Sequence, residues 1–146
     1  LGVDRTFLVV LLSAYTEDGN RIFLKLKPKL APYKAAVFPL LHNKPELVAK
    51  AKEIYDNLRK EFMVAWDDRG NIGKRYYSQD EIGTPYCITV DFDTLEKGTV
   101  TVRDRDNAKQ ETISVEELAG FIKSKIYIWK ERTNEKYPKT LFVRRQ

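Results

Sequence analysis

A strand–helix–strand pattern in the first half of the chain constrains the fold more than any other feature. Two short apolar runs, at 34–39 and 63–66, have the length and composition of buried strands. Between them, at 45–62, apolar residues recur at the spacing of one helix face, and Pro45 suits the first turn of that helix. Parallel strands need a crossover of this kind, so the pattern predicts a βαβ unit.

The second half of the chain extends this unit into a larger sheet. Gly83 and Pro85 supply stop signals after a helical stretch, and the capping-box sequence that begins at Ser114 predicts a final helix. The expected segments are a helix at 74–82, strands at 86–92, 99–104 and 110–114, and a helix at 115–128. Strands alternating with helices predict an α/β fold: a three-layer α/β/α domain with a mixed sheet of about five strands.

The N-terminal part differs from this domain. Residues 5–15 are apolar almost all round, which is typical of a helix buried on every side. A turn cluster follows at 16–20, and residues 21–32, interrupted by Pro28 and Pro32, fit an extended linker. We therefore expect one residual helix of a preceding domain before the main domain begins.

The expected organisation places this chain inside a longer protein. The first residue is Leu1, and no signal-peptide pattern precedes the apolar run. That run is too short to span a bilayer, and the single cysteine, Cys87, fits a reducing, cytoplasmic setting. The expected divisions are 1–31 (end of the preceding domain and linker), 32–128 (main domain) and 129–146 (a basic and aromatic extension).

The charge distribution favours a polyanionic partner. The net charge is +5, and ten Lys and Arg residues face three Asp and Glu residues between positions 21 and 60. Lysine and arginine displace counterions from phosphates, so nucleic acid is one candidate partner. The alternative is a basic surface that serves only solubility.

Residues for an independent catalytic site are scarce. The only histidine is His42 and the only cysteine is Cys87, which excludes a Cys/His zinc cluster, and one histidine in a basic loop does not favour a nucleophilic triad. No glycine spacing matches a phosphate-binding loop. A small nucleotide-using enzyme is therefore a weak alternative, and we expect His42 to be a loop residue and no metal to be bound.

Three long sequence blocks carry a resemblance to a known family. They are GKRYYSQDEIGTP at 73–85, ITVDFDT at 88–94 and TVTVRDRD at 99–106, and APYKAAVFPL at 31–40 agrees with them. Together they closely resemble the anticodon-binding domain of the dimeric, class II glycyl-tRNA synthetases. The resemblance extends to about residue 128 and implies binding of a glycine tRNA.

The first residues add a shorter resemblance. Gly2, Val3, Asp4 and Arg5 are similar to the end of motif 3 of class II synthetases, which implies that Arg5 contacts ATP and the other three line that site. By this resemblance the whole protein would be a homodimeric ligase that uses glycine, ATP and Mg²⁺. The present chain lacks the other motifs, so we expect it to be an inactive monomer without a cofactor.

The implied function suggests which side chains meet RNA. Glycine anticodons end in two cytosines. The amino group of cytosine can donate a hydrogen bond to a carboxylate, and its O2 and N3 atoms can accept hydrogen bonds from arginine or lysine. Aromatic side chains can stack on unpaired loop bases. The candidate residues of these types are Lys74, Arg75, Tyr77, Phe92, Asp93, Arg103, Asp104, Arg105 and Asp106.

Several alternatives stay open at this point. Residues 103–106 could form ion pairs with each other, and Asp80 could pair with Lys74 or Arg75. Asp91 and Asp93, read as one strand face, could bind a divalent cation. Only one of the adjacent tyrosines at 76 and 77 can face the core. A non-catalytic accessory protein that shares the fold is the main functional alternative, and residues 2–5 argue against it.

Overall fold

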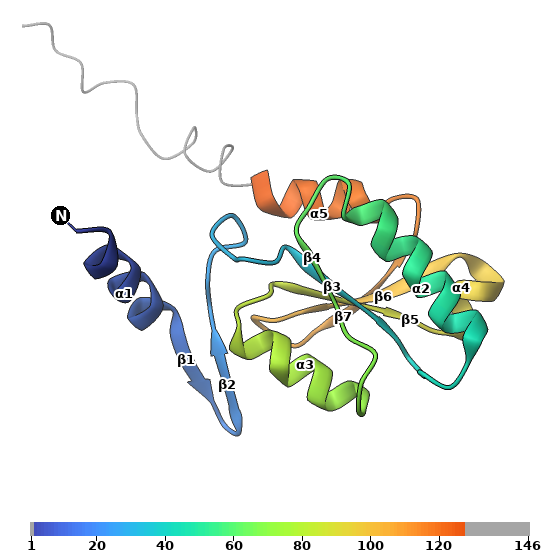
Figure 1. Ribbon diagram of the computed structural model, residues 1–146, viewed down its shortest axis with the longest axis horizontal. Coiled ribbons are helices and arrows are strands. Elements are labelled where there is room, and N and C mark those ends of the chain that lie inside the picture. The colour runs from blue at the N-terminus through green and yellow to red at the C-terminus, as the bar shows by residue number, and fades with distance from the viewer. Residues whose placement is uncertain (1, 128–146) are drawn as a thin grey trace, which may run out of the picture.

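A five-stranded mixed sheet forms the centre of the structure, a computed structural model that describes residues 2–127 (Figure 1). The strands are β3 (Ala35–Pro39), β4 (Val64–Trp66), β5 (Tyr86–Val90), β6 (Thr99–Asp104) and β7 (Gln110–Ser114), in the order β4-β3-β5-β6-β7. β3 pairs in parallel with both β4 and β5, and the remaining pairs are antiparallel. The predicted mixed α/β sheet is confirmed.

Helices cover both faces of this sheet. α2 (Pro45–Leu58) and α5 (Leu118–Tyr127) lie on one face, and α3 (Ile72–Glu81) lies on the other (Figure 1). The opposite placement of α2 and α3 follows from the strand order. The chain crosses from β3 to β4 and then back past β3 to β5, and right-handed crossovers in opposite directions put their helices on opposite faces.

Alternating side chains divide the core between these two faces. In β3, Ala35 and Val37 join the cluster under α2 and α5, whereas Ala36 and Phe38 join the cluster under α3. All five residues of β3 are buried, as expected of a central parallel strand covered on both sides. The apolar run at 34–39 therefore reflects burial on two faces.

The last helix begins later than its capping-box sequence predicts. The Glu116 N–H, not that of Glu117, donates to Ser114 Oγ, at 3.3 Å, and Glu117 N–H donates to the Ser114 carbonyl. These bonds form a turn over 115–117, and regular helix starts at Leu118. The predicted end at residue 128 and the extension at 129–146 lie outside the described residues.

The N-terminal segment corrects the prediction of a turn followed by an extended linker. After α1 (Val3–Ala14), β1 (Tyr15–Asp18) and β2 (Arg21–Leu24) form an antiparallel hairpin. Its two-residue turn starts at Gly19, whose φ of 60° lies in the left-handed region that favours glycine. This hairpin was not predicted from the sequence because the charged and polar residues at 17–21 have a composition typical of a loop.

The apolar surface of α1 lies largely open in the described part of the chain. Ala14 is its only buried residue there, and Phe7 and Leu12 are 63% and 68% exposed. Complete burial of this helix therefore does not occur within residues 2–127. None of the helices in this range has the length and apolar character needed to cross a bilayer.

Candidate nucleic-acid interface

An open crevice lies at the carboxyl ends of β3 and β4. The chain leaves β3 toward α2 on one face and leaves β4 toward α3 on the other, so the two loops diverge. Such switch points are where open α/β sheets bind ligands. His42 from the first loop and Asp68, Arg69 and Gly70 from the second line a hollow of about 380 Å³.

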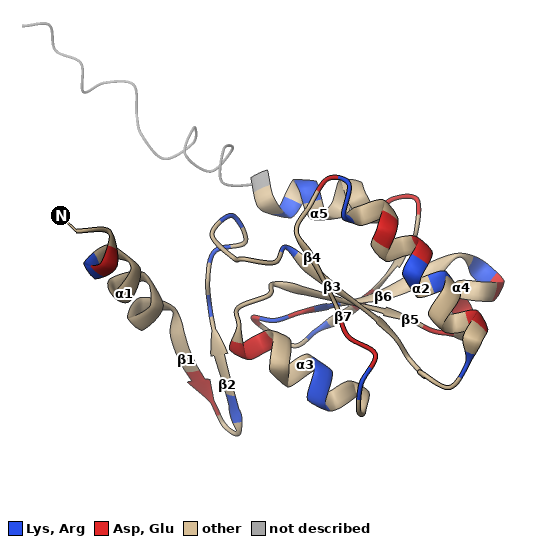
Figure 2. Ribbon diagram, in the orientation of Figure 1, with Lys and Arg blue, Asp and Glu red and all other residues tan. Residues whose placement is uncertain are grey.

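The crevice offers both hydrogen-bond donors and acceptors. The Arg69 side chain is 93% exposed, and the Asp67 carboxylate accepts a bond of 3.0 Å from the Arg69 N–H, which fixes the loop. Figure 2 shows that this loop is acidic where it leaves β4 and basic where it approaches α3. A guanidinium and a carboxylate on one rim match the acceptors and the amino group of a nucleobase edge.

Arg75 holds the loops that form the crevice. The residue is 1% exposed, and its guanidinium donates to four backbone carbonyls. Nη1 bonds to Pro39 O at 2.6 Å, and the other bonds reach the carbonyls of Asp68, Arg69 and Gly70. One side chain thus joins the end of β3 to the loop after β4. The structure places Arg75, a predicted RNA contact, inside the protein.

The outer face of α3 presents two of the predicted residues to solvent. Lys74 is exposed in the first turn, where its N–H donates to Asn71 Oδ1 at 2.9 Å and closes the helix cap. Tyr77 is 49% exposed. Tyr76 faces the sheet, with its hydroxyl 2.6 Å from Thr89 Oγ1. The prediction that only one of the two tyrosines faces the core is confirmed.

Phe92 and Asp93 begin a helix and do not continue β5, which corrects the predicted strand at 86–92. Asp91 caps α4 (Phe92–Lys97) in a reciprocal capping box with Thr94. Phe92 is 48% exposed, and Asp93 bonds to Lys97 Nζ at 3.0 Å. The capping role of Asp91 removes the shared strand face on which the alternative of a cation bound by Asp91 and Asp93 depends.

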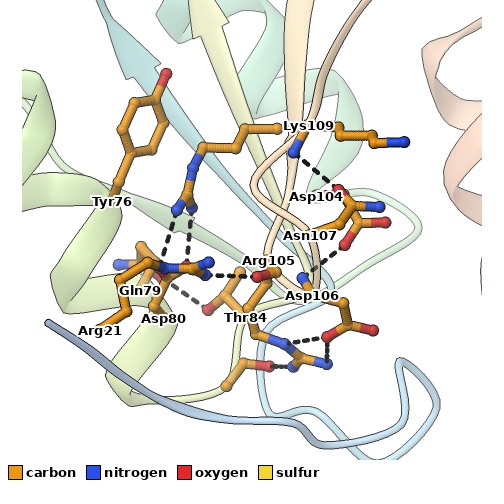
Figure 3. A network of polar contacts seen from close by, with 12 residues as sticks. Arg21, Tyr76, Gln79, Asp80, Thr84, Asp104, Arg105, Asp106, Asn107 and Lys109 are labelled. Carbon is orange, nitrogen blue, oxygen red and sulfur yellow. Dashed lines mark hydrogen bonds and ion pairs between the residues drawn. The ribbon is translucent and has the colours of Figure 1, made fainter. Parts of the chain in front are cut away.

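The arginines after β5 lie in a buried network at the opposite end of the sheet (Figure 3). Arg103 forms a bidentate ion pair with Asp80 of α3: Nη1 donates to Oδ1 at 2.9 Å and Nη2 donates to Oδ2 at 3.0 Å. Asp80 is fully buried and also accepts from Arg21 of β2 at 3.2 Å. Arg103 stacks above the Tyr76 ring, 4.8 Å from its centroid. One alternative was that Asp80 pairs with Lys74 or Arg75, but its ion pairs are with Arg103 and Arg21.

Arg105 extends this network to the segment after β2. Its Nη1 donates to Gly83 O and its Nη2 to Leu26 O, both at 2.6 Å, and it pairs with Asp106 at 2.9 Å. Arg105 is 1% exposed. Asp104 accepts from the Asp106 N–H at 2.7 Å. The alternative of ion pairing within residues 103–106 is confirmed for Arg105 and Asp106.

The predicted RNA-contacting residues therefore differ in exposure. Lys74, Tyr77, Phe92 and Asp93 are exposed on α3 and α4, and Asp106 is exposed after β6. Arg75, Arg103 and Arg105 are buried, and Asp104 is partly buried. Asp104 lies opposite Tyr86, at the start of β5, and Phe92 follows the end of that strand. At about 3.3 Å per residue, the two ends of β5 are about 13 Å apart.

Buried titratable groups show no activated nucleophile. Burial, together with the nearby Asp80 charge, raises the pKa of the Cys87 thiol to about 12. Burial also raises the pKa of Tyr86 to about 12, with Asp104 contributing. Both groups keep their protons at neutral pH. Within residues 2–127, no three His, Cys, Asp or Glu side chains gather at a metal-binding position.

The residues predicted to line an ATP site stand at the start of α1. Gly2 occupies the cap position, and Val3, Asp4 and Arg5 form the first turn, all exposed. The ATP contact that the resemblance implies for Arg5 stays a prediction.

Sequence reasoning missed three residues of the crevice as ligand contacts. His42 was expected only as a loop residue, and Asp68 and Arg69 were not considered. Their common signal is position, since each follows the carboxyl end of a predicted parallel strand. The direction in which the chain turns after each strand was needed to identify the switch point.

Comparison with known proteins shows the family to which this domain belongs. A family model described as "Anticodon binding domain" matches residues 34–125. The chain is 51% identical over 139 residues to a glycine–tRNA ligase of Borreliella afzelii (strain PKo), covering 92% of this chain and 31% of that protein. It is 54% identical over 129 residues to that of Chlorobaculum tepidum, covering 86% and 27%.

A third relative gives the same relation. The glycine–tRNA ligase of Thermobifida fusca (strain YX) is 48% identical over 134 residues, covering 86% of this chain and 29% of that protein. The chain therefore spans less than a third of each of these relatives. The family match covers most of the sheet and its helices, and this chain belongs to the family of anticodon-binding domains.

Proposed function

We propose that this chain binds the anticodon loop of a glycine tRNA as part of a glycine–tRNA ligase. The observation that carries the proposal is the crevice at the switch point of a domain of the anticodon-binding family. The identity of about half the residues to named glycine–tRNA ligases supports the choice of tRNA. The alternative of a non-catalytic accessory protein is not favoured by these names.

In this proposal the crevice takes an unstacked base and the exposed side chains around it hold the loop. Asp68 would accept from the cytosine amino group, and Arg69 would donate to O2 or N3. Lys74 would contact phosphates, and Tyr77 and Phe92 offer exposed rings for stacking. Asp93, Asp104 and Asp106 remain candidates for a base edge. The buried Arg75 would support the crevice from below, whereas Arg103 and Arg105, buried in the network at the opposite end of the sheet, would support the fold there without touching RNA.

The activity of the whole protein is also part of the proposal. It would attach glycine to its tRNA with ATP and Mg²⁺, as a homodimer in the cytoplasm, and residues 2–5 would join its ATP site. Residues 1–146 alone would be inactive and monomeric. A division between residues 31 and 32 is also part of the proposal. The start of the family match at residue 34 supports it, although Arg21 and Leu26 form hydrogen bonds with the main domain.

Binding to a glycine anticodon stem-loop tests this proposal. We expect each replacement of an anticodon cytosine by uracil to cost about 1–3 kcal/mol, the usual value of a base-edge contact. Asp68→Asn should reduce this discrimination, while Glu53→Gln on α2, an exposed matched control, should not. Equal binding to all stem-loops would leave only phosphate contacts and contradict base reading by this chain.

A further inference from the structure

Arg75 differs from the other buried charges in having no carboxylate partner. Four of its bonds end on main-chain carbonyls, and no ion pair involves it within residues 2–127. Arg103 and Arg105, by comparison, each pair with an aspartate. The unit charge of Arg75 is therefore not cancelled by a neighbouring anion.

The four carbonyls belong to both loops that frame the crevice. Pro39 ends β3, just before the loop that carries His42, and the other three acceptors, Asp68, Arg69 and Gly70, themselves line the hollow. A guanidinium has a rigid fork of donors, so one arginine can fix several carbonyls at once. Loss of this fork would release both rims together.

The charge of Arg75 lies beside the amino end of α3, and the two act in the same direction. Asn71 caps this helix, and its first turn carries the partial positive charge of the helix dipole. A buried charge is screened less by salt than an exposed one. Arg75 and the amino end of α3 therefore add positive charge beneath the crevice, beside Asp67 and Asp68 of the same loop, and this charge favours the acceptor-rich edge of a base or a phosphate oxygen.

We propose that Arg75 is a positioning residue that sets the spacing and potential of the crevice, and that base selectivity depends on it without direct contact to RNA. This inference rests on the proposed function for its RNA readout. The positioning itself is a property of the protein alone. It gives Arg75, at 1% exposure, a role other than the direct RNA contact that the sequence predicts.

Two substitutions separate hydrogen bonding from charge. Arg75→Lys keeps the charge but loses the fork, and Arg75→Gln keeps a neutral amide that can donate to carbonyls. Arg59→Ala, at an exposed ion pair on α2, is the matched control. Each full chain is studied by hydrogen exchange without RNA, and by binding to the glycine stem-loop and its uracil versions.

We expect both Arg75 variants to exchange amides at 67–71 at least about 10-fold faster, with β5 unchanged, and to lose most discrimination between cytosine and uracil. Arg75→Gln should also bind more weakly to every stem-loop, because it lacks the charge. Unchanged exchange at 67–71, or an equal rise throughout the sheet, would overturn the inference. If a variant does not fold, slow exchange of the Arg75 Nε–H in the unmodified chain is the remaining test, and fast exchange overturns the proposal.

The RNA arm separates this inference from the proposed function. If the unmodified chain binds all stem-loops equally, the proposed function fails, yet faster exchange confined to 67–71 still establishes positioning by Arg75. If the unmodified chain discriminates and the Arg75 variants discriminate equally well, base reading is independent of Arg75 and this inference fails alone.

Discussion

The two ends of the sheet hold buried arginines in different ways. At the carboxyl end, Arg75 donates only to carbonyls and keeps its net charge beneath an open crevice. At the amino end, Asp80 neutralises Arg103 and also pairs with Arg21. We call this buried polar network of Arg21, Asp80, Arg103 and Arg105 the seam. A buried arginine without a carboxylate partner can therefore shape an open surface, whereas one that forms an ion pair can join two segments of the chain.

The seam attaches the N-terminal hairpin to the domain through specific polar contacts. Arg21 of β2 reaches Asp80 and the Arg105 carbonyl, and Arg105 returns a bond to Leu26. Gly83 has a φ of 83°, and a Cβ there would lie 2.8 Å from Leu26 Cδ1. The segment after β2 thus packs directly on the turn between α3 and β5.

The largest expected effect tests whether the seam depends on its carboxylate. Asp80→Ala leaves Arg21 and Arg103 without their shared buried partner, which should lower the free energy of unfolding by about 3–5 kcal/mol. Asp106→Ala, at a half-exposed carboxylate, should cost less than about 1 kcal/mol. Urea denaturation of both variants is the measurement. Similar losses would remove the distinction between a buried and a rim aspartate.

Two glycines compare packing at the seam with packing at the crevice. Both have positive φ, but Gly83 faces Leu26 and the Leu24 carbonyl, whereas nothing lies near a Cβ at Gly70. Gly83→Ala should therefore cost about 3 kcal/mol, from left-handed strain plus overpacking, and Gly70→Ala about 1 kcal/mol from strain alone. Thermal denaturation distinguishes them, and equal losses would mean that contact with Leu26 contributes nothing.

The buried Cys87 thiol should make the stability of the folded chain depend on pH in the alkaline range. The pKa of Cys87 is about 12 in the folded chain against 9.0 for a free thiol, so the folded state keeps the proton longer. Stability is then full below pH 9 and falls as pH rises toward 12, by up to about 1.4 kcal/mol per pH unit.

Cys87→Ala should flatten this dependence between pH 9 and 10, before the Tyr86 hydroxyl begins to contribute. The measurement is the free energy of unfolding at half-unit steps of pH. An identical slope for both proteins in that interval would show that the thiol does not retain its proton on folding.

The smallest effect on stability is expected at the rim of the crevice. Arg69 is almost fully exposed, so Arg69→Ala should change the free energy of unfolding by less than about 0.5 kcal/mol. If Arg69 meets a phosphate, the slope of log affinity against log salt should decrease by about 1 in magnitude. An unchanged slope together with lost cytosine preference would assign Arg69 to a base edge.

Regular periodicity made most of the domain predictable. β6 and β7 match their expected bounds, and β3 and β4 differ by one residue at the start. α4 was missed because Phe92, its first residue, follows the apolar run of β5 closely enough to be predicted as part of that strand, with the capping residue Asp91 between them. The hairpin was missed because its pairing was hidden by loop-like polar residues.

The site was less predictable than the fold because burial of a charged side chain depends on distant partners. Arg103 is separated from Asp80 by 23 residues and Arg21 by 59, and no local pattern signals either pair. Arg75 forms no ion pair with a carboxylate in the described range 2–127. Residues in α3 whose exposure follows from a single helix face, such as Tyr77, were easier to place.

The shortness of β4 has a consequence for self-association. β4 is an edge strand of three residues, because the loop that lines the crevice begins directly after Trp66. Short edge strands offer few free backbone groups on which another sheet could grow, and the opposite edge, β7, exposes polar side chains. The early end of β4, which leaves room for the crevice, therefore also makes this edge of the sheet a poor site for pairing with strands of other chains.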